Sequence, residues 1–311
     1  MRRAAALLLS LTVFAAACSS SGSEDRSVAA SGSPSGGKPR TEVTSEVATS
    51  GTGETTEATV GVAARSEARG GSPGVPFVAS PEASGGSSYE ADTMLGVRYG
   101  VHEGYERVVL DLGTGNEPAE TVPEWTIMCP KGDGLLRVTL PSVSATGVSD
   151  GKLGGDRLKS FYVVRAPEGG MFVDVLAREA FAYRVLELSD PARLVVDFKA
   201  SGKPLGAPLP EVGGDTVLVE PRADARISAP LTVSGYSRNF EASNTVVLTD
   251  PKGEVVIRKT VESNDWSETW GYFEATLDLP PFGGEGTLRV GAESARDGGF
   301  EGVEIPVYES R

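Results

Sequence analysis

Short runs of apolar residues, separated by Gly, Pro and Asp, follow one another from Tyr89 to position 200. In the run at 135–140, Leu136, Val138 and Leu140 alternate with polar residues, which is the two-residue period of a half-buried strand. No segment carries the apolar stripe of a long amphipathic helix, so this region predicts a β-sandwich over 89–200. Its other predicted strands are at 97–99, 107–112, 125–129, 161–164, 171–176, 183–188 and 193–198, with hairpin turns at 167–170 and 189–192.

A second set of strands begins after a connector rich in Gly and Pro at 201–214. The run at 273–279 has the cleanest alternation of apolar and polar residues in the chain. Further strands are predicted at 217–219, 231–235, 245–248, 255–257, 287–290 and 303–307, with a hairpin turn at 250–253. About seven strands over ~95 residues match the size of an immunoglobulin-like sandwich. The predicted fold class is all-β: two β-sandwich domains in tandem, at 89–200 and 215–311.

The N-terminal stretch has the composition of a targeting signal. A basic start precedes an apolar run at 4–14, and small residues then lead directly to Cys18, which is typical of a secretory signal peptide. The run is shorter than the ~20 residues that span a bilayer. The stretch resembles the lipobox of bacterial lipoproteins, in which the Cys thiol is acylated, although Ala15 stands where Leu is usual. We predict a lipoprotein signal peptide at 1–17 and lipidation of Cys18; a cleaved signal with a chance Cys is the alternative.

The segment at 18–88 is of low complexity and is dominated by Ser, Gly, Thr, Ala and Glu. Such a composition buries too little apolar surface to offset the entropy of ordering, so the prediction is a lipidated Cys followed by a disordered linker. A flexible chain of ~70 residues has an r.m.s. span of about 45–50 Å. The linker would hold the two sandwiches outside a cell membrane to which the lipid anchors them.

Composition and charge exclude several classes of function. The chain carries 29 Lys and Arg against 43 Asp and Glu, a formal net charge of −14. Without a basic cluster it is a poor candidate for nucleic acid, whose binding depends on phosphate neutralisation. Two Cys and one His are too few for a disulfide framework or a cysteine-rich zinc site. We expect no cofactor and no metal, and contact with the membrane only through the lipid on Cys18.

Two family resemblances cover nearly all of the predicted folded part. Residues ~91–199 resemble the AMIN-like domain of bacterial envelope lipoproteins, on the pieces at 97–111, 135–140 and 188–197. This resemblance implies a β-sandwich module without catalytic residues; AMIN domains proper are associated with peptidoglycan binding and envelope targeting. Residues ~216–308 resemble the immunoglobulin-like domain of bacterial spore-germination lipoproteins, on the pieces at 228–235, 239–241, 250–253, 286–290 and 305–307.

The candidate binding residues of the first predicted sandwich are His102, Tyr105, Arg107 and Arg193. His102 is expected at a strand end, where ordering the loop, contacting a ligand and acting in catalysis are all open, in falling order of preference. Arg107 and Arg193 each begin an apolar strand and each precede an Asp by four residues. A charge pair that closes the sandwich edge is the preferred interpretation, and an arginine rim that holds ligand carboxylates is the alternative.

The candidates of the second predicted sandwich are Trp266 and Trp270, in a polar loop ahead of the strand at 273–279. Aromatic residues on such a loop can stack on sugar rings or mark a protein contact. The preferred interpretation for Trp270 is that it caps the core of the sandwich. Cys129 is expected to be a buried apolar residue, since no His or cluster of basic residues lies near it in sequence.

Together these features predict a non-enzymatic, lipid-anchored, extracytoplasmic protein of the cell envelope. It would bind peptidoglycan or a wall-associated protein, each weak contact being strengthened by tethering. Two alternatives remain. One is a protein–protein module that regulates a wall hydrolase or acts in a sporulation or germination complex. The other is an enzyme of unrecognised type centred on His102.

Overall fold

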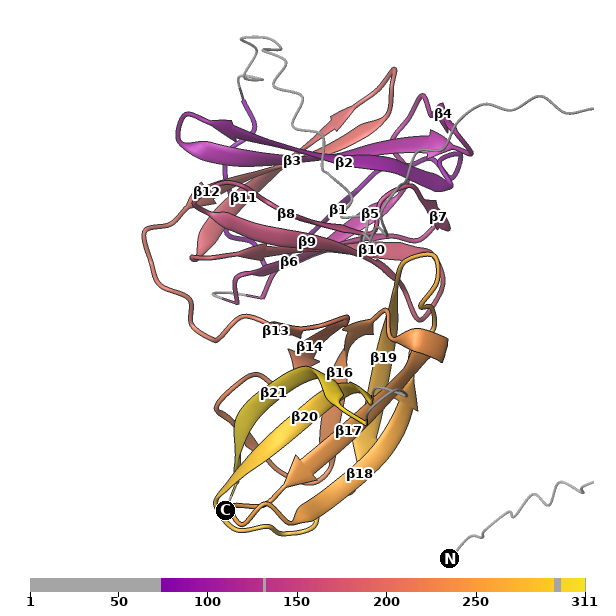
Figure 1. The fold of residues 1–311 in the computed structure, drawn as a ribbon. Coiled ribbons are helices and arrows are strands. Elements are labelled where there is room, and N and C mark those ends of the chain that lie inside the picture. The colour runs from indigo at the N-terminus through magenta and orange to yellow at the C-terminus, as the bar shows by residue number, and fades with distance from the viewer. Residues whose placement is uncertain (1–73, 131–132, 294–297, 311) are drawn as a thin grey trace, which may run out of the picture. The chain divides into compact units, whose positions relative to one another are not determined.

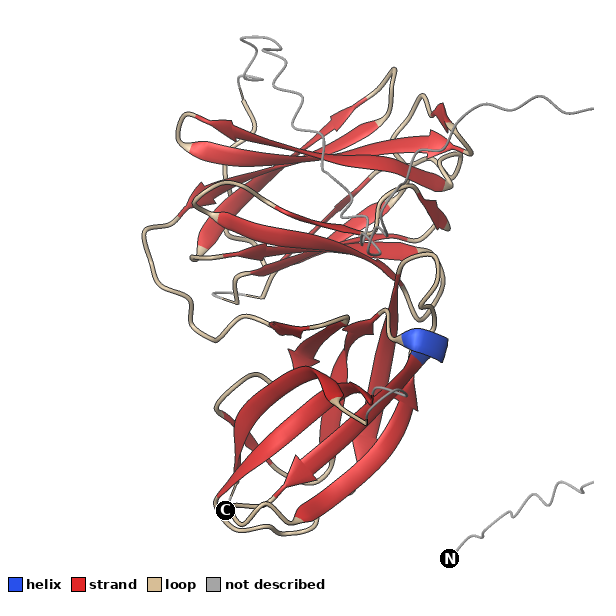
Figure 2. Cartoon of the chain, viewed as in Figure 1, coloured by secondary structure: helices blue, strands red, loops and turns tan. Residues whose placement is uncertain are grey.

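The computed structural model of the chain describes residues 74–130, 133–293 and 298–310 (Figure 1). This part is built of strands, with one short 3₁₀ turn at Phe240–Ala242, as the colours of Figure 2 show. The predicted all-β fold class is therefore confirmed. No helix in this part is long and apolar enough to span a membrane. The predicted signal peptide, Cys18 and the linker up to residue 73 lie outside the described residues.

The first sandwich pairs a six-stranded sheet with six strands of a ten-stranded sheet. The six-stranded sheet has the order β11-β12-β3-β2-β7, with β4 on the end of β3. Its strands are β2 (Thr93–His102), β3 (Tyr105–Thr114), β4 (Glu117–Pro118), β7 (Ala145–Thr146), β11 (Phe181–Leu188) and β12 (Arg193–Ala200). The facing half-sheet consists of β1 (Glu82–Gly85), β5 (Trp125–Met128), β6 (Leu135–Leu140), β8 (Asp150–Lys152), β9 (Leu158–Arg165) and β10 (Met171–Ala177).

The second sandwich supplies the other four strands of that ten-stranded sheet and a five-stranded sheet of its own. The shared sheet continues from β9 into β19 (Trp270–Leu277), β16 (Leu231–Ser237), β14 (Thr216–Glu220) and β13 (Glu211–Gly213). The five-stranded sheet has the order β15-β21-β20-β17-β18. These strands are β15 (Ala225–Ile227), β17 (Ser243–Thr249), β18 (Val255–Glu262), β20 (Glu285–Glu293) and β21 (Phe300–Glu309).

Each sandwich has its own hydrophobic core, formed by the inward side chains of period-two strands. Leu136, Val138 and Leu140 of β6 lie in the first core, which confirms the inward face predicted for this strand. Phe273 and Leu277 of β19 lie in the second core in the same way. A third cluster lies outside both cores, between the two sandwiches. It is the feature that decides which surfaces remain open.

The hairpin turns follow the predicted chemistry. Gly169 and Gly170, between β9 and β10, adopt left-handed φ angles of 98° and 70° that L-residues with a side chain rarely take. At the β17–β18 turn, Asp250 accepts hydrogen bonds at Oδ1 from the backbone N–H groups of Lys252 and Glu254, each at 2.8 Å. Gly253 closes this turn with φ 83°.

The prediction of disorder through Ser88 is wrong for the last part of that segment. Glu82–Gly85 forms β1, an edge strand that pairs antiparallel with β5. Val78 forms an isolated antiparallel bridge with Tyr183 on the edge of β11. An edge strand is held by backbone hydrogen bonds and needs few apolar residues, so composition alone does not reveal it. The connector predicted at 201–214 likewise contains a short strand, β13, which pairs with β14.

Candidate functional site

One of the two outer faces of the first sandwich is covered by the second sandwich. In Figure 1 β6, β9 and β10 lie between the β2–β3 sheet and the strands of the second sandwich. Outward side chains of these strands pack against β14, β16 and β19 in the third cluster: Leu135, Tyr162, Val164, Phe172 and Leu176 on one side, Val217, Tyr236 and Trp270 on the other. This face is therefore unavailable to a ligand.

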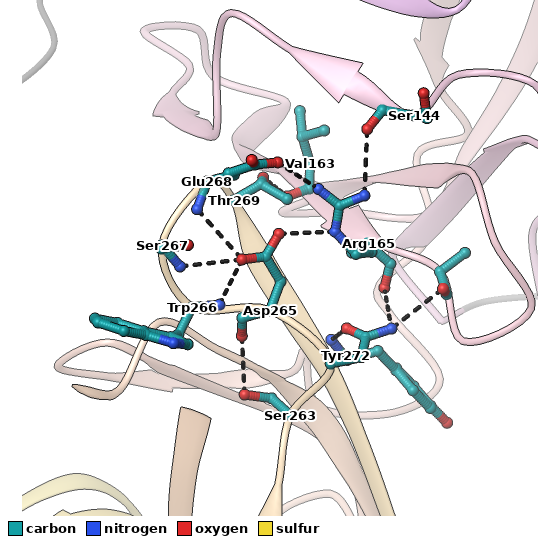
Figure 3. Close-up of polar contacts among 12 residues, drawn as sticks. Ser144, Val163, Arg165, Ser263, Asp265, Trp266, Ser267, Glu268, Thr269 and Tyr272 are labelled. Atoms are coloured by element: carbon teal, nitrogen blue, oxygen red, sulfur yellow. Dashed lines mark hydrogen bonds and ion pairs between the residues drawn. The ribbon is translucent and has the colours of Figure 1, made fainter. Parts of the chain in front are cut away.

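A group of hydrogen bonds and ion pairs joins the two sandwiches at this interface (Figure 3). Arg165, at the end of β9, donates from Nε to Asp265 Oδ2 at 2.7 Å and from Nη2 to Glu268 Oε2 at 2.8 Å. Its Nη1 donates to the backbone oxygen of Ser144 at 3.2 Å. The other oxygen of Asp265 accepts the backbone N–H groups of residues 266–268. Hydrogen bonds from Arg165 and from these N–H groups outweigh partial burial and lower the pKa of Asp265.

The backbones of the two sandwiches also pair directly. Trp270 of β19 lies opposite Val164 of β9 in a short parallel ladder. Asn264 donates from Nδ2 to the backbone oxygens of Arg165 and Ala166, each at 3.1 Å. Thr269 Oγ1 donates to the backbone oxygen of Val163 at 2.6 Å. The polar loop ahead of β19 is thus an interdomain connection.

Trp270, a predicted binding residue, is buried in this interface and only 5% exposed. Its ring makes edge contacts with Tyr162 at 5.1 Å and Tyr236 at 5.9 Å between centroids. Its Nε1 donates to Asp150 Oδ1 at 3.1 Å. The structural interpretation holds for Trp270, although it caps the junction between the sandwiches rather than the core of one. The prediction that it binds a ligand is not compatible with this burial.

The other outer face of the first sandwich carries four of the predicted candidates. Register places Arg107 of β3 opposite Asp197 of β12. Arg107 binds this carboxylate through Nε at 2.6 Å and Nη2 at 2.9 Å, and Arg184 of β11 donates to its Oδ2 at 2.7 Å. Asp197 has no exposed side-chain surface, so two guanidinium groups share one buried carboxylate.

Arg193, the other candidate arginine, does not form an equivalent ion pair within the described part of the chain. Arg193 lies opposite Asp111 in the same register, but Asp111 binds Arg98 of β2 through two hydrogen bonds of 2.6 and 2.7 Å. Arg193 instead donates from Nε to the backbone oxygen of Pro191 at 3.3 Å. Arg193 is partly exposed, and no ion pair joins it to a carboxylate of the described residues.

Aromatic rings line one end of this face. The rings of His102 and Tyr105 stack across the β2–β3 turn, 4.7 Å apart and 7° from parallel. Phe77 lies 6.1 Å from Tyr105. The Arg184 guanidinium lies 4.6 Å from the Phe77 ring and 5.1 Å from the Tyr105 ring, and Lys199 Nζ lies 5.7 Å from Phe77. We call this outer surface of β2, β3, β11 and β12, with Phe77, the cationic–aromatic face.

The charge of the cationic–aromatic face is opposite to that of the whole chain. Its outward strand positions hold five cations and two carboxylates, an excess of three positive charges, whereas the chain has a net charge of −14. These residues are Arg98, Arg107, Arg184, Arg193 and Lys199, with Asp111 and Asp197. The face therefore suits a ligand that has negative groups and flat or cyclic units.

His102 stacks on Tyr105 at one end of this face. Partial burial and then the nearby Arg107 charge lower the pKa of its imidazole, so the neutral ring predominates at neutral pH. Within the described residues its ring contact is with Tyr105, and no three His, Cys, Asp or Glu residues there could hold a metal ion.

Cys129 is also in a structural position. It packs against the edge of the first core, and burial raises the pKa of its thiol to about 11. A thiol with such a pKa remains protonated at neutral pH, so the side chain behaves as a small apolar group.

Trp266 lies apart from the cationic–aromatic face, in the loop before β19. Sequence reasoning missed its neighbour Phe240, as well as Arg184, Lys199 and Phe77. Period-two alternation from Asp197 could have indicated Lys199 on β12. Arg184 lies on β11, and its position opposite Asp197 follows from the strand register. Phe77 lies in the segment predicted to be disordered, and only the fold brings it to this face.

Comparison with known protein families agrees with both resemblances found in the sequence. Residues 92–200 match the AMIN-like domain, and residues 217–299 match Gmad2, the immunoglobulin-like domain of bacterial spore germination. No curated protein and no solved structure matches the chain. Domains of these two kinds indicate a non-enzymatic module of the cell envelope or of germination, on the outer side of the membrane. The chain thus combines, in this order, an AMIN-like domain and a Gmad2 immunoglobulin-like domain.

Proposed function

We propose that this protein is a wall-binding component of the cell envelope that attaches to peptidoglycan through the cationic–aromatic face of its AMIN-like domain. The observation that carries the proposal is the difference between the two outer faces of that domain. One is covered by the Gmad2 domain, and the other concentrates positive charge and aromatic rings on an acidic protein.

Peptidoglycan offers the complementary chemistry. Its stem peptides carry carboxylates, which arginine binds through paired hydrogen bonds and lysine through its point charge. Its glycan strands present sugar rings to aromatic side chains. Arg193 and Lys199 are the cations to engage such carboxylates, because neither pairs with a carboxylate of the described residues. Arg107 and Arg184 remain bound to Asp197 and hold the surface in place.

The affinity of one such face for a repeating polymer is expected to be modest. An acylated Cys18 and a long linker would confine the domain to the space next to the membrane, and thereby raise its effective concentration at the wall. Lipid anchoring is part of this proposal, and it accounts for binding at physiological concentrations without a deep pocket.

The test is sedimentation of the purified full chain with purified cell-wall sacculi. We expect the chain to pellet with the sacculi, and the double variant Arg193→Glu and Lys199→Glu to bind at least about tenfold more weakly. The matched control is Lys252→Glu with Lys259→Glu, which makes the same charge change at exposed positions of the Gmad2 domain. Full recovery of the unmodified chain in the supernatant would refute wall binding.

A further inference from the structure

Two exposed aromatic side chains meet on the surface of the Gmad2 domain. Phe240 is 72% exposed and Trp266 is 37% exposed, although both are large apolar residues. Their rings contact each other edge to face, with centroids 5.1 Å apart and planes at 74°. They come from two loops separated in sequence, the 3₁₀ turn before β17 and the loop before β19. We call them the aromatic pair.

The loop that carries Phe240 is held in an unfavourable backbone conformation. Glu241 and Ala242 both have left-handed φ angles, 55° and 58°, and neither is a glycine. Such conformations are unfavourable for residues with a side chain and persist only where the surroundings determine them. Here the backbone oxygen of Ala242 accepts three hydrogen bonds, from Ser263 N at 2.9 Å, Ser263 Oγ at 3.2 Å and Asn244 Nδ2 at 3.2 Å.

Buried amide side chains complete this support. Asn239 donates from Nδ2 to Thr216 Oγ1 at 2.9 Å and to Asn244 Oδ1 at 2.8 Å. Asn239, Asn244 and Thr216 are all buried. A buried polar network of this kind favours one conformation, so Phe240 is presented to solvent by an ordered support.

The loop that carries Trp266 is fixed with equal strength. The Trp266 backbone N–H donates to Asp265 Oδ1 at 2.6 Å, and Asp265 is in turn bound by Arg165 of the AMIN-like domain. The aromatic pair is therefore ordered before any partner binds. Exposed aromatic anchors that are already ordered lose little conformational entropy on binding and dominate many protein interfaces.

The charge around the aromatic pair identifies the kind of partner. The two loops, residues 238–242 and 263–269, together with the adjoining Glu262 contain four carboxylates and one cation, Arg238, which lies 3.9 Å from Asp150. Of these carboxylates, Asp265 and Glu268 pair with Arg165, whereas Glu241 and Glu262 are exposed. An acidic rim favours a basic partner and repels an anionic membrane surface. The perpendicular rings also present no flat platform on which consecutive sugar units could stack.

We propose that the aromatic pair is a docking site for a protein segment in which an apolar side chain is flanked by Lys or Arg. This goes beyond the proposed wall binding, because the site lies on the other domain and uses the opposite charge. The AMIN-like domain would then bind the wall, and the Gmad2 domain would bind a basic protein segment, so that the protein links the two.

The test selects random linear peptides displayed on phage against the immobilised full chain, with counter-selection on the Phe240→Ser, Trp266→Ser double variant. We expect enriched peptides that combine an aliphatic or aromatic residue with Lys or Arg. A synthetic enriched peptide, titrated by calorimetry, should bind the Phe240→Ser variant at least about tenfold more weakly. The charge-reversed Glu241→Lys variant should also lose affinity.

The matched controls are Val255→Ser, which removes another exposed apolar side chain of the Gmad2 domain, and Glu301→Lys, which reverses a carboxylate on β21. Both should retain peptide binding, and Phe240→Ser should keep the unfolding temperature because Phe240 is largely exposed. The proposal is overturned if no peptide depends on the aromatic pair, if enriched peptides are acidic, or if the double variant instead loses sacculus binding. The first two results would leave the wall-binding proposal unaffected. Loss of sacculus binding in the double variant would instead place the wall-binding site on the Gmad2 domain.

Discussion

Replacement of Trp270 by Ala should uncouple the unfolding of the two domains. Trp270 touches Tyr162 across the interface and donates to Asp150, and it lies in the third cluster rather than in either core. Truncation of a buried Trp to Ala typically costs about 3–5 kcal/mol through lost burial and a residual cavity. Because the lost contacts join the two domains, we expect this free energy to be lost from the interaction between the domains.

The magnitude predicts a measurable change in thermal unfolding. For a folded region of this size, each 1 kcal/mol shifts the transition by roughly 2–4 °C, so the affected transition should fall by about 6–20 °C. Calorimetry of the full chain should give a single cooperative transition for the unmodified protein, and two transitions or one broadened transition for Trp270→Ala.

Two other tryptophans serve as matched controls. Trp125→Ala removes an equally buried ring from the first core. It should destabilise the AMIN-like domain but leave the contacts between the two domains in place. Trp266→Ala removes the exposed ring of the same loop as Trp270 and should change the transition little. If the unmodified chain already unfolds in two steps, or if Trp270→Ala shifts it no more than Trp266→Ala does, the coupling argument is wrong.

Three further predictions concern the AMIN-like face and the N-terminal signal. Asp197→Ala should cost about 3 kcal/mol in urea unfolding, because it leaves two partly buried guanidinium groups without their shared carboxylate; a loss below ~1 kcal/mol would contradict the buried pair. NMR titration of His102 should give a pKa below about 6.5, and Arg107→Gln should raise it. Since the unfolded chain then binds the proton more tightly, this imidazole should reduce stability as the pH falls below about 6.5, and a measured pKa at or above that value would refute the assignment. Metabolic labelling with a fatty-acid analogue should mark the protein in cells and fail on Cys18→Ser, whereas equal labelling of both would exclude this anchor.

Sequence reasoning was most reliable where a strand has one buried and one open face. In β19 the polar residues Glu274 and Thr276 are exposed and the intervening residues are buried, as the alternation predicts. Near the start of the same strand, Trp270 and Tyr272 point outward and are nevertheless buried or half-buried, because the AMIN-like domain covers them. β10 is buried along its whole length for the same reason.

The candidate site could be predicted only in part. Period-two spacing is sufficient to place Arg107 and Asp111 on one face of a strand, and the repeat of this spacing at Arg193 and Asp197 indicates a similar environment. It does not specify register, and register decided that Arg107 binds Asp197 while Asp111 binds Arg98. Phe240 gave no signal in sequence, since a single aromatic residue in a polar turn has no periodicity.

The sequence alone therefore determined the all-β class, the positions of the longer strands and the two domain families, because these follow from local alternation, turn residues and motif order. The short strands β1 and β13 were found only in the structure. Only the tertiary structure decided which of the outer faces remain open. That choice depends on contacts between residues such as Phe172 and Tyr236, more than sixty positions apart along the chain, which join two strands that each look half-exposed by themselves. The second sandwich packs against one outer face of the AMIN-like domain and leaves the charged face of the six-stranded sheet open. Tertiary contacts also bring Phe240 against Trp266. The local sequence pattern does not specify such pairings. An alternating strand can bury its apolar face against any other apolar surface, so the pattern alone does not identify its partner.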